Sequence, residues 1–109
     1  MKLVHHKDLS PDKWFGYSLN QQLANVGSEV ERTINWKKKD KKLANLAFER
    51  MLELLDLTIA DSKNKTKLKE LCRLREVLID QLWGKNEYKS TEQSTIRYFY
   101  FFNYLARTV

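Results

Sequence analysis

The residues best suited to chemistry in this chain are lysines, which gather in two short stretches. The first stretch covers 37–42 and holds five lysines, interrupted only by Asp40. In the second stretch, lysine stands at every other position of 63–69. The candidate nucleic-acid-binding residues are Lys37, Lys38, Lys39, Lys41, Lys42, Lys63, Lys65, Lys67 and Lys69. Lysine binds phosphate as a point charge, so we expect non-specific, salt-sensitive contacts with RNA or DNA.

The two stretches differ in how far local structure explains them. Cations after a helix complement the negative end of its dipole, and a solvated turn needs polar residues, which explains much of 37–42. Lys65, Lys67 and Lys69 lie instead around the expected start of a helix, where the dipole disfavours positive charge. An anionic partner supplies a reason for them, because helix N-terminal amides and lysines together bind phosphate.

Aromatic residues beside these lysines form a second group with a candidate role in binding. Trp36 directly precedes the first lysine stretch, while Trp83 and Tyr88 lie on either side of Lys85. Such rings stack on unpaired bases, although packing in a core or at an interface is their commoner use. We single out these three aromatics as candidates for base stacking.

Catalytic and metal-binding patterns are missing from the sequence. His5 and His6 are the only histidines and precede every expected helix, so the inward Glu-x-x-His pairs of a di-iron bundle cannot form. Glu53 and Asp56 match the Glu-x-x-Asp half of the all-α NTP pyrophosphatases, but the upstream Glu-x-x-Glu is absent. We therefore predict a protein that is not an enzyme and has no cofactor or metal, with the pyrophosphatase as the weakest alternative.

The composition predicts one helical domain. Its 109 residues suffice for one hydrophobic core but not two, so we treat 1–109 as a single domain. Three Gly and one Pro are few helix breakers, which favours long helices over a many-turned β fold. The formal net charge of +6 favours anionic partners, nucleic acid first.

The N-terminal residues and the cysteine content predict a cytoplasmic protein. Leu3 and Val4 are followed at once by His5, a pattern unlike a secretory signal. No apolar run reaches the length that spans a bilayer, so we expect no membrane association. Cys72 is the single cysteine, which suits a reducing compartment, and its neighbours predict a small core or boundary residue.

An irregular lead-in over 1–9 is expected to precede the first helical signal. Ser10 and Pro11 combine a helix N-cap with proline at the first helical position. They predict a short turn that ends at Gly16. Its aromatic residues Trp14 and Phe15 are expected to cover one end of the core.

The first long helix is predicted to begin at Ser18, where a capping box pairs Ser18 with Gln21. Its apolar seam recurs at steps of four and three, as expected for a helix in a bundle: Leu19, Leu23, Val26, Val30 and Thr33. Gly27 lies inside this helix at a cost of about 1 kcal/mol relative to Ala. We expect it to allow close approach of a neighbouring helix.

The central helix is predicted over 43–60, after a turn in the lysine-rich stretch. The residues expected to face the core are Leu43, Leu46, Ala47, Met51, Leu54, Leu55 and Thr58. After a turn at 61–65, Thr66 is expected to cap a third helix that Gly84 closes.

The last helix is predicted to begin with a second capping box, Ser90 to Gln93, and to carry an almost continuous aromatic run. Because that run is apolar nearly all round, the helix lies deep in the bundle or its outer face meets another subunit. Short loops between four long helices imply an antiparallel up-down-up-down four-helix bundle, with both ends basic.

The stretch 17–60, with SLNQQLANVGSEVERTI, a lysine-rich turn and FERMLELLDLTIA, resembles a known group of small bundles. It is similar to the four-helix-bundle proteins typified by the large-subunit rRNA intervening-sequence proteins, and to the accessory variability proteins of diversity-generating retroelements. The positions that match the family's helices are Leu19, Gln22, Leu23, Val26, Glu29, Val30, Leu52, Glu53 and Leu54. The family's Pro after Ser-Ile and its Asn-Ile-Ala-Glu-Gly are missing. The resemblance implies a homo-oligomer, often a pentameric ring, with a basic surface that binds nucleic acid.

Taken together, the sequence predicts an all-α, antiparallel up-down-up-down four-helix bundle that is a homo-oligomer through its last helix. The expected function is non-catalytic binding of RNA or DNA, or assembly, through the basic ends. An adaptor bundle that binds protein partners without nucleic acid is the alternative.

Overall fold

The structure is a computed structural model that describes residues 9–108, with side chains described over 9–106. Within that range the chain forms helices and no strand, which confirms the all-α fold class. Most of the predicted lead-in, 1–8, lies outside the described residues. The elements in chain order are α1 (Pro11–Phe15), α2 (Leu19–Lys37), α3 (Lys41–Ala60), the 3-10 helix η1 (Ser62–Lys67), α4 (Leu68–Leu82) and α5 (Glu92–Thr108).

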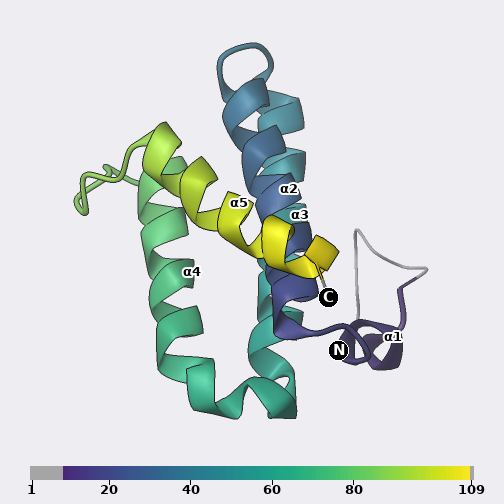
Figure 1. Cartoon of the computed structure of the whole chain (residues 1–109). Coiled ribbons are helices and arrows are strands. Elements are labelled where there is room, and N and C mark those ends of the chain that lie inside the picture. Colours follow the sequence, from purple (N-terminus) through teal and green to yellow (C-terminus); the bar gives the residue numbers. More distant parts are fainter. Residues whose placement is uncertain (1–8, 109) are drawn as a thin grey trace.

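Helices α2 and α3 form a long antiparallel hairpin, which is the most extensively packed pair of elements. The predicted capping box opens α2: the Ser18 N–H donates to Gln21 Oε1 at 2.9 Å, and the Gln21 N–H donates to Ser18 Oγ at 3.2 Å. Asp40 caps α3, where its Oδ1 accepts from the backbone N–H groups of Lys42 and Leu43. Figure 1 shows that the tip of this hairpin extends beyond α4 and α5.

The hydrophobic core lies between the hairpin, α5 and one stripe of α4. Its most completely buried apolar side chains are Val26, Val30, Met51, Leu55, Leu57 and Leu78. The prediction that Leu43 and Leu46 face the core is wrong, because more than a third of each residue is exposed. Both belong to the part of α3 near the hairpin tip, where α2 is the main neighbour (Figure 1).

Helix α5 crosses α2 obliquely and rests on Gly27. A Cβ atom built at Gly27 would lie 2.6 Å from Phe99 Cβ and 2.8 Å from Phe99 Cγ. The predicted close approach of a neighbouring helix is therefore confirmed. The predicted capping box at the start of α5 is off by one residue, since Thr91 and Ser94 exchange the reciprocal hydrogen bonds.

Helix α4 is reached through η1 and makes far less contact with α3 than α2 does. The predicted cap by Thr66 is wrong: α4 has no side-chain cap, and the helical turns already begin at Ser62, where Asp61 accepts from the Lys63 N–H. Cys72, predicted to be a core or boundary residue, is exposed. It lies next to the buried Leu71, on the part of α4 that turns away from the core.

Candidate nucleic-acid interface and an adjoining groove

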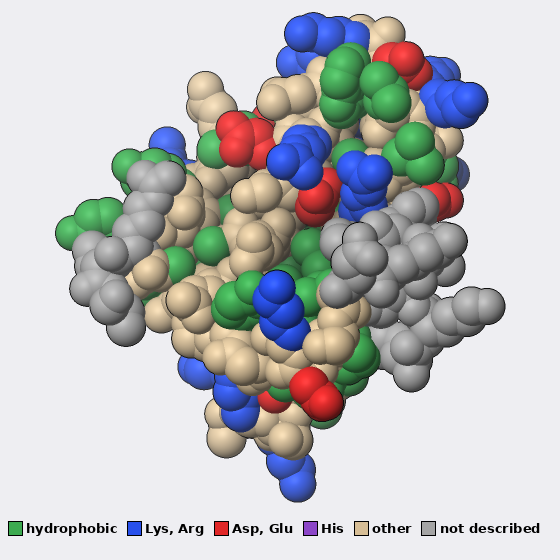
Figure 2. All heavy atoms as spheres, turned by 90° about the vertical axis from the view of Figure 1, so that its right-hand side faces the viewer, with side chains coloured by type: hydrophobic (Ala, Val, Ile, Leu, Met, Phe, Trp, Pro, Cys, Tyr) green, Lys and Arg blue, Asp and Glu red, His purple; other side chains and the backbone are tan. Residues whose placement is uncertain are grey.

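The first lysine stretch forms the tip of the α2–α3 hairpin, and all five of its lysines are exposed. Figure 2 shows Lys and Arg side chains gathered at this end of the molecule. Lys38 is the one lysine of this stretch that forms an ion pair within the described residues, with its Nζ 3.3 Å from Glu92 Oε2. Both partners are exposed, so that pair contributes little to stability. Asp40, which caps α3, is the one acid of this stretch and offsets one of its five lysines, so the tip keeps an excess of positive charge.

Trp36 lies at the base of this lysine tip and is 39% exposed. It borders a hollow of about 200 Å³ together with Arg32, Asn35 and Lys39. An exposed indole among cations provides a stacking surface for an unpaired base beside phosphate-binding groups.

The other two candidate aromatics already have partners within the chain. Trp83 stacks on Phe48, with ring centroids 5.1 Å apart and an interplanar angle of 11°. Tyr88 lies beneath the Arg73 guanidinium, 5.2 Å from its ring centroid. Trp36 is the least exposed of the three, at 39% against 57% for Trp83 and 47% for Tyr88, but among the described residues its ring has no aromatic or cation partner.

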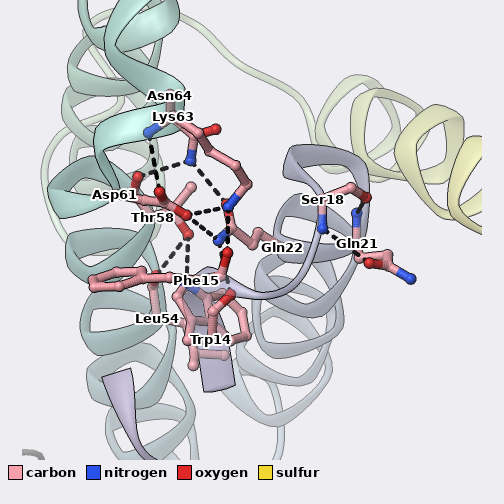
Figure 3. Close-up of polar contacts among 10 residues, drawn as sticks. All are labelled: Trp14, Phe15, Ser18, Gln21, Gln22, Leu54, Thr58, Asp61, Lys63 and Asn64. Atoms are coloured by element: carbon pink, nitrogen blue, oxygen red, sulfur yellow. Dashed lines mark hydrogen bonds and ion pairs between the residues drawn. The ribbon is translucent and has the colours of Figure 1, made fainter. Parts of the chain in front are cut away.

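The second lysine stretch begins at a buried polar network that joins α1, α2, α3 and η1 (Figure 3). Gln22 Nε2 donates to Asp61 Oδ2 at 2.8 Å and to the Trp14 carbonyl at 3.0 Å. Asn64 Nδ2 donates to Gln22 Oε1 at 2.8 Å and to the Thr58 carbonyl at 3.0 Å. Buried polar groups paired in this way fix the geometry of this end of the molecule.

Lys63 belongs to this network rather than to a free basic surface. Its Nζ donates to the Phe15 carbonyl at 2.9 Å and forms an ion pair with Asp61. Burial by itself raises the pKa of the Asp61 carboxyl, but hydrogen bonds donated by Lys63 and Gln22 outweigh that effect and lower it. Asp61 also supplies the negative charge that the start of a helix attracts, so η1 has no need of an external anion there.

Sequence reasoning missed this network. Where a turn is expected at 61–65, the structure has the start of η1, and Asp61 at its N-cap is a residue type favoured at helix starts. The remaining predicted lysines of the second stretch, Lys65, Lys67 and Lys69, are exposed.

Lys67 and Lys69 also border a groove of about 570 Å³ between α4 and α5. The groove exists because these two helices diverge instead of packing closely together. Sequence reasoning missed it as well. Lys65 is exposed and does not line the groove. The four lysines of the second stretch therefore have three surroundings: Lys63 lies in the polar network, Lys65 lies on the surface, and the other two border the groove.

The described residues contain no group of three or more His, Cys, Asp or Glu side chains placed to hold a metal ion. Asp56, half of the Glu-x-x-Asp match, forms an ion pair with Arg75, with Asp56 Oδ1 and Arg75 Nε 2.8 Å apart. None of the described helices is both long enough and apolar enough to cross a bilayer.

Comparison of the chain with models of protein families, with curated proteins and with solved structures finds no match. The resemblance of 17–60 to the rRNA-associated and retroelement bundles stays a prediction.

Proposed function

We propose that this protein binds nucleic acid without catalysis, and that the tip of the α2–α3 hairpin is its main contact. The observation that carries the proposal is the exposed lysine tip, whose positive charge the described residues leave almost unpaired, with Trp36 exposed at its base. Of the expected up-down-up-down bundle the proposal needs only the antiparallel α2–α3 hairpin, because α5 crosses α2 obliquely and α4 and α5 diverge. Lys65, Lys67 and Lys69, at the opposite end of α3, add further phosphate contacts.

The arrangement favours single-stranded over double-stranded partners. Lysines contact phosphates in either case, but only an unpaired base can lie against the Trp36 ring. Nothing at the tip supplies the paired donors and acceptors that read base edges, so binding is non-specific in sequence.

The outer face of α5, formed by Ile96, Tyr100, Phe101 and Tyr104, supports self-association. All four residues are exposed, and Ile96, Tyr100 and Tyr104 follow one another at steps of four along one stripe of the helix. Exposed apolar patches of this kind mark interaction sites. A homo-oligomer would place several basic tips on one particle, which strengthens binding by avidity.

The proposal is tested by fluorescence anisotropy of a labelled single-stranded RNA with wild-type protein, Trp36→Ala and Trp36→Phe. Stacking of one base contributes about 1–3 kcal/mol, so Trp36→Ala weakens binding by that amount while Trp36→Phe retains most of it. A duplex of the same sequence should bind all three proteins alike. If wild-type protein binds neither the single strand nor the duplex at low salt, nucleic-acid binding is refuted. If all three proteins bind the single strand equally, the stacking role of Trp36 alone is wrong.

A further inference from the structure

The groove between α4 and α5 combines an apolar lining with a basic end. Leu74 and Val77 of α4 face Phe99 of α5 across it. Lys67 and Lys69 border it where α4 begins. None of these residues belongs to the hairpin tip, so the groove offers a site separate from the proposed main nucleic-acid contact.

Polar groups in the groove favour an anion over a cation. Three cations border it, Lys67, Lys69 and Arg73, against one acid, Glu70, which gives an excess of two positive charges. Tyr98 adds a neutral donor: burial raises the pKa of its phenol, and Glu70 acts in the same direction. Within the described residues the Tyr98 hydroxyl has no hydrogen-bond partner, so it is available to a ligand.

We propose that the α4–α5 groove binds a small amphipathic anion, with an apolar body against Leu74, Val77 and Phe99 and its anionic head at Lys67 and Lys69. Its volume of about 570 Å³ falls within the range of small-molecule sites, which runs from about 300 to 1,000 Å³. The groove is therefore matched in size to a small molecule.

The test uses anilinonaphthalene sulfonate, an apolar aromatic anion whose fluorescence rises in an apolar site, with the full chain. Decanoate, decanol and decylammonium then compete with it. These three competitors share one alkyl chain and differ in the charge of the head group. We expect decanoate to displace the probe at the lowest concentration and decylammonium at the highest.

Variants locate the probe. Val77→Phe fills the groove, and Lys67→Glu with Lys69→Glu reverses its basic end; each should weaken probe binding about tenfold or more. Lys65→Glu makes the same type of charge change outside the groove, and Tyr100→Ser removes an aromatic ring from the outer face of α5. Both controls should bind as wild type does, and circular dichroism should show equal helicity throughout.

Three results would overturn the proposal. They are absence of probe binding, equal competition by decanoate and decylammonium, and loss of binding in Tyr100→Ser but not in Val77→Phe. The last result would place the probe on the outer face of α5. The outcome does not depend on whether the hairpin tip binds nucleic acid, since the tip residues are unchanged in every variant.

Discussion

Neutralising two lysines of the hairpin tip should change how binding depends on salt. Five lysines lie at the tip and Lys38 is paired with Glu92, which leaves four for phosphate contacts. Each phosphate contact with a single strand contributes about −0.7 to the slope of log K against log salt, so the expected slope is about −2.8. A fourfold rise in salt then lowers the affinity about 50-fold. In the double variant Lys39→Gln with Lys41→Gln the slope becomes shallower, about −1.4, and the same fourfold rise in salt lowers the affinity only about sevenfold.

The assay is anisotropy of a labelled single strand over a series of salt concentrations. The matched control is Lys13→Gln with Arg50→Gln, which also removes two positive charges, but from exposed positions away from the tip. If only net charge mattered, the control and the tip variant would lose slope equally. Equal slopes in these two variants would refute the assignment of binding to the tip.

Three further predictions concern stability and assembly. Gly27→Ala should lower the free energy of unfolding by about 1–3 kcal/mol in urea, because its Cβ overlaps α5. Gly16→Ala, whose Cβ meets only backbone oxygens of its own turn, the nearest at 3.3 Å, should cost less than Gly27→Ala; equal effects would contradict the packing argument. Because folding lowers the pKa of Asp61, its ionised carboxyl stabilises the fold at pH values above 3.8, the ordinary pKa of Asp. That stabilisation is lost as the pH falls below 3.8 and through the lowered pKa. Thermal melts should therefore show Asp61→Asn less stable than wild type at neutral pH, with the difference shrinking below that pH; a constant difference would argue against the linkage. Tyr100→Arg should reduce the mass measured by light scattering, and an unchanged oligomer would exclude the outer face of α5 as the interface.

Local signals predicted much of the fold. The capping box at Ser18 and the proline at the start of α1 act through hydrogen bonds and steric limits within a few residues, so they appear in the sequence as fixed spacings. The apolar seam of α2 likewise follows from helical periodicity. Gly27 was informative because a glycine inside a helix is costly without a reason.

Features that depend on distant residues were not predictable in the same way. Asn64 is buried because Gln22, 42 positions earlier, accepts its hydrogen bond, and no local pattern records that pairing. The exposure of Leu43 depends on where the other helices stop, since an apolar residue at a core spacing is buried only where a neighbour reaches it. For the candidate interface, the sequence located the lysine tip but not the separation of Lys63 from the other lysines of its stretch.

The groove between α4 and α5 exists because its two helices pack against different parts of the molecule. Phe99 rests on Gly27, so α5 is anchored to α2. Helix α4 follows η1, whose Asn64 is held by Gln22 and by the Thr58 carbonyl near the end of α3. A helix anchored on α2 and another fixed by the end of α3 cannot also pack closely along their length, and the space between them is the groove. Gly27 therefore sets the position of one wall, which is why the same small residue governs both the stability of the fold and the width of the site.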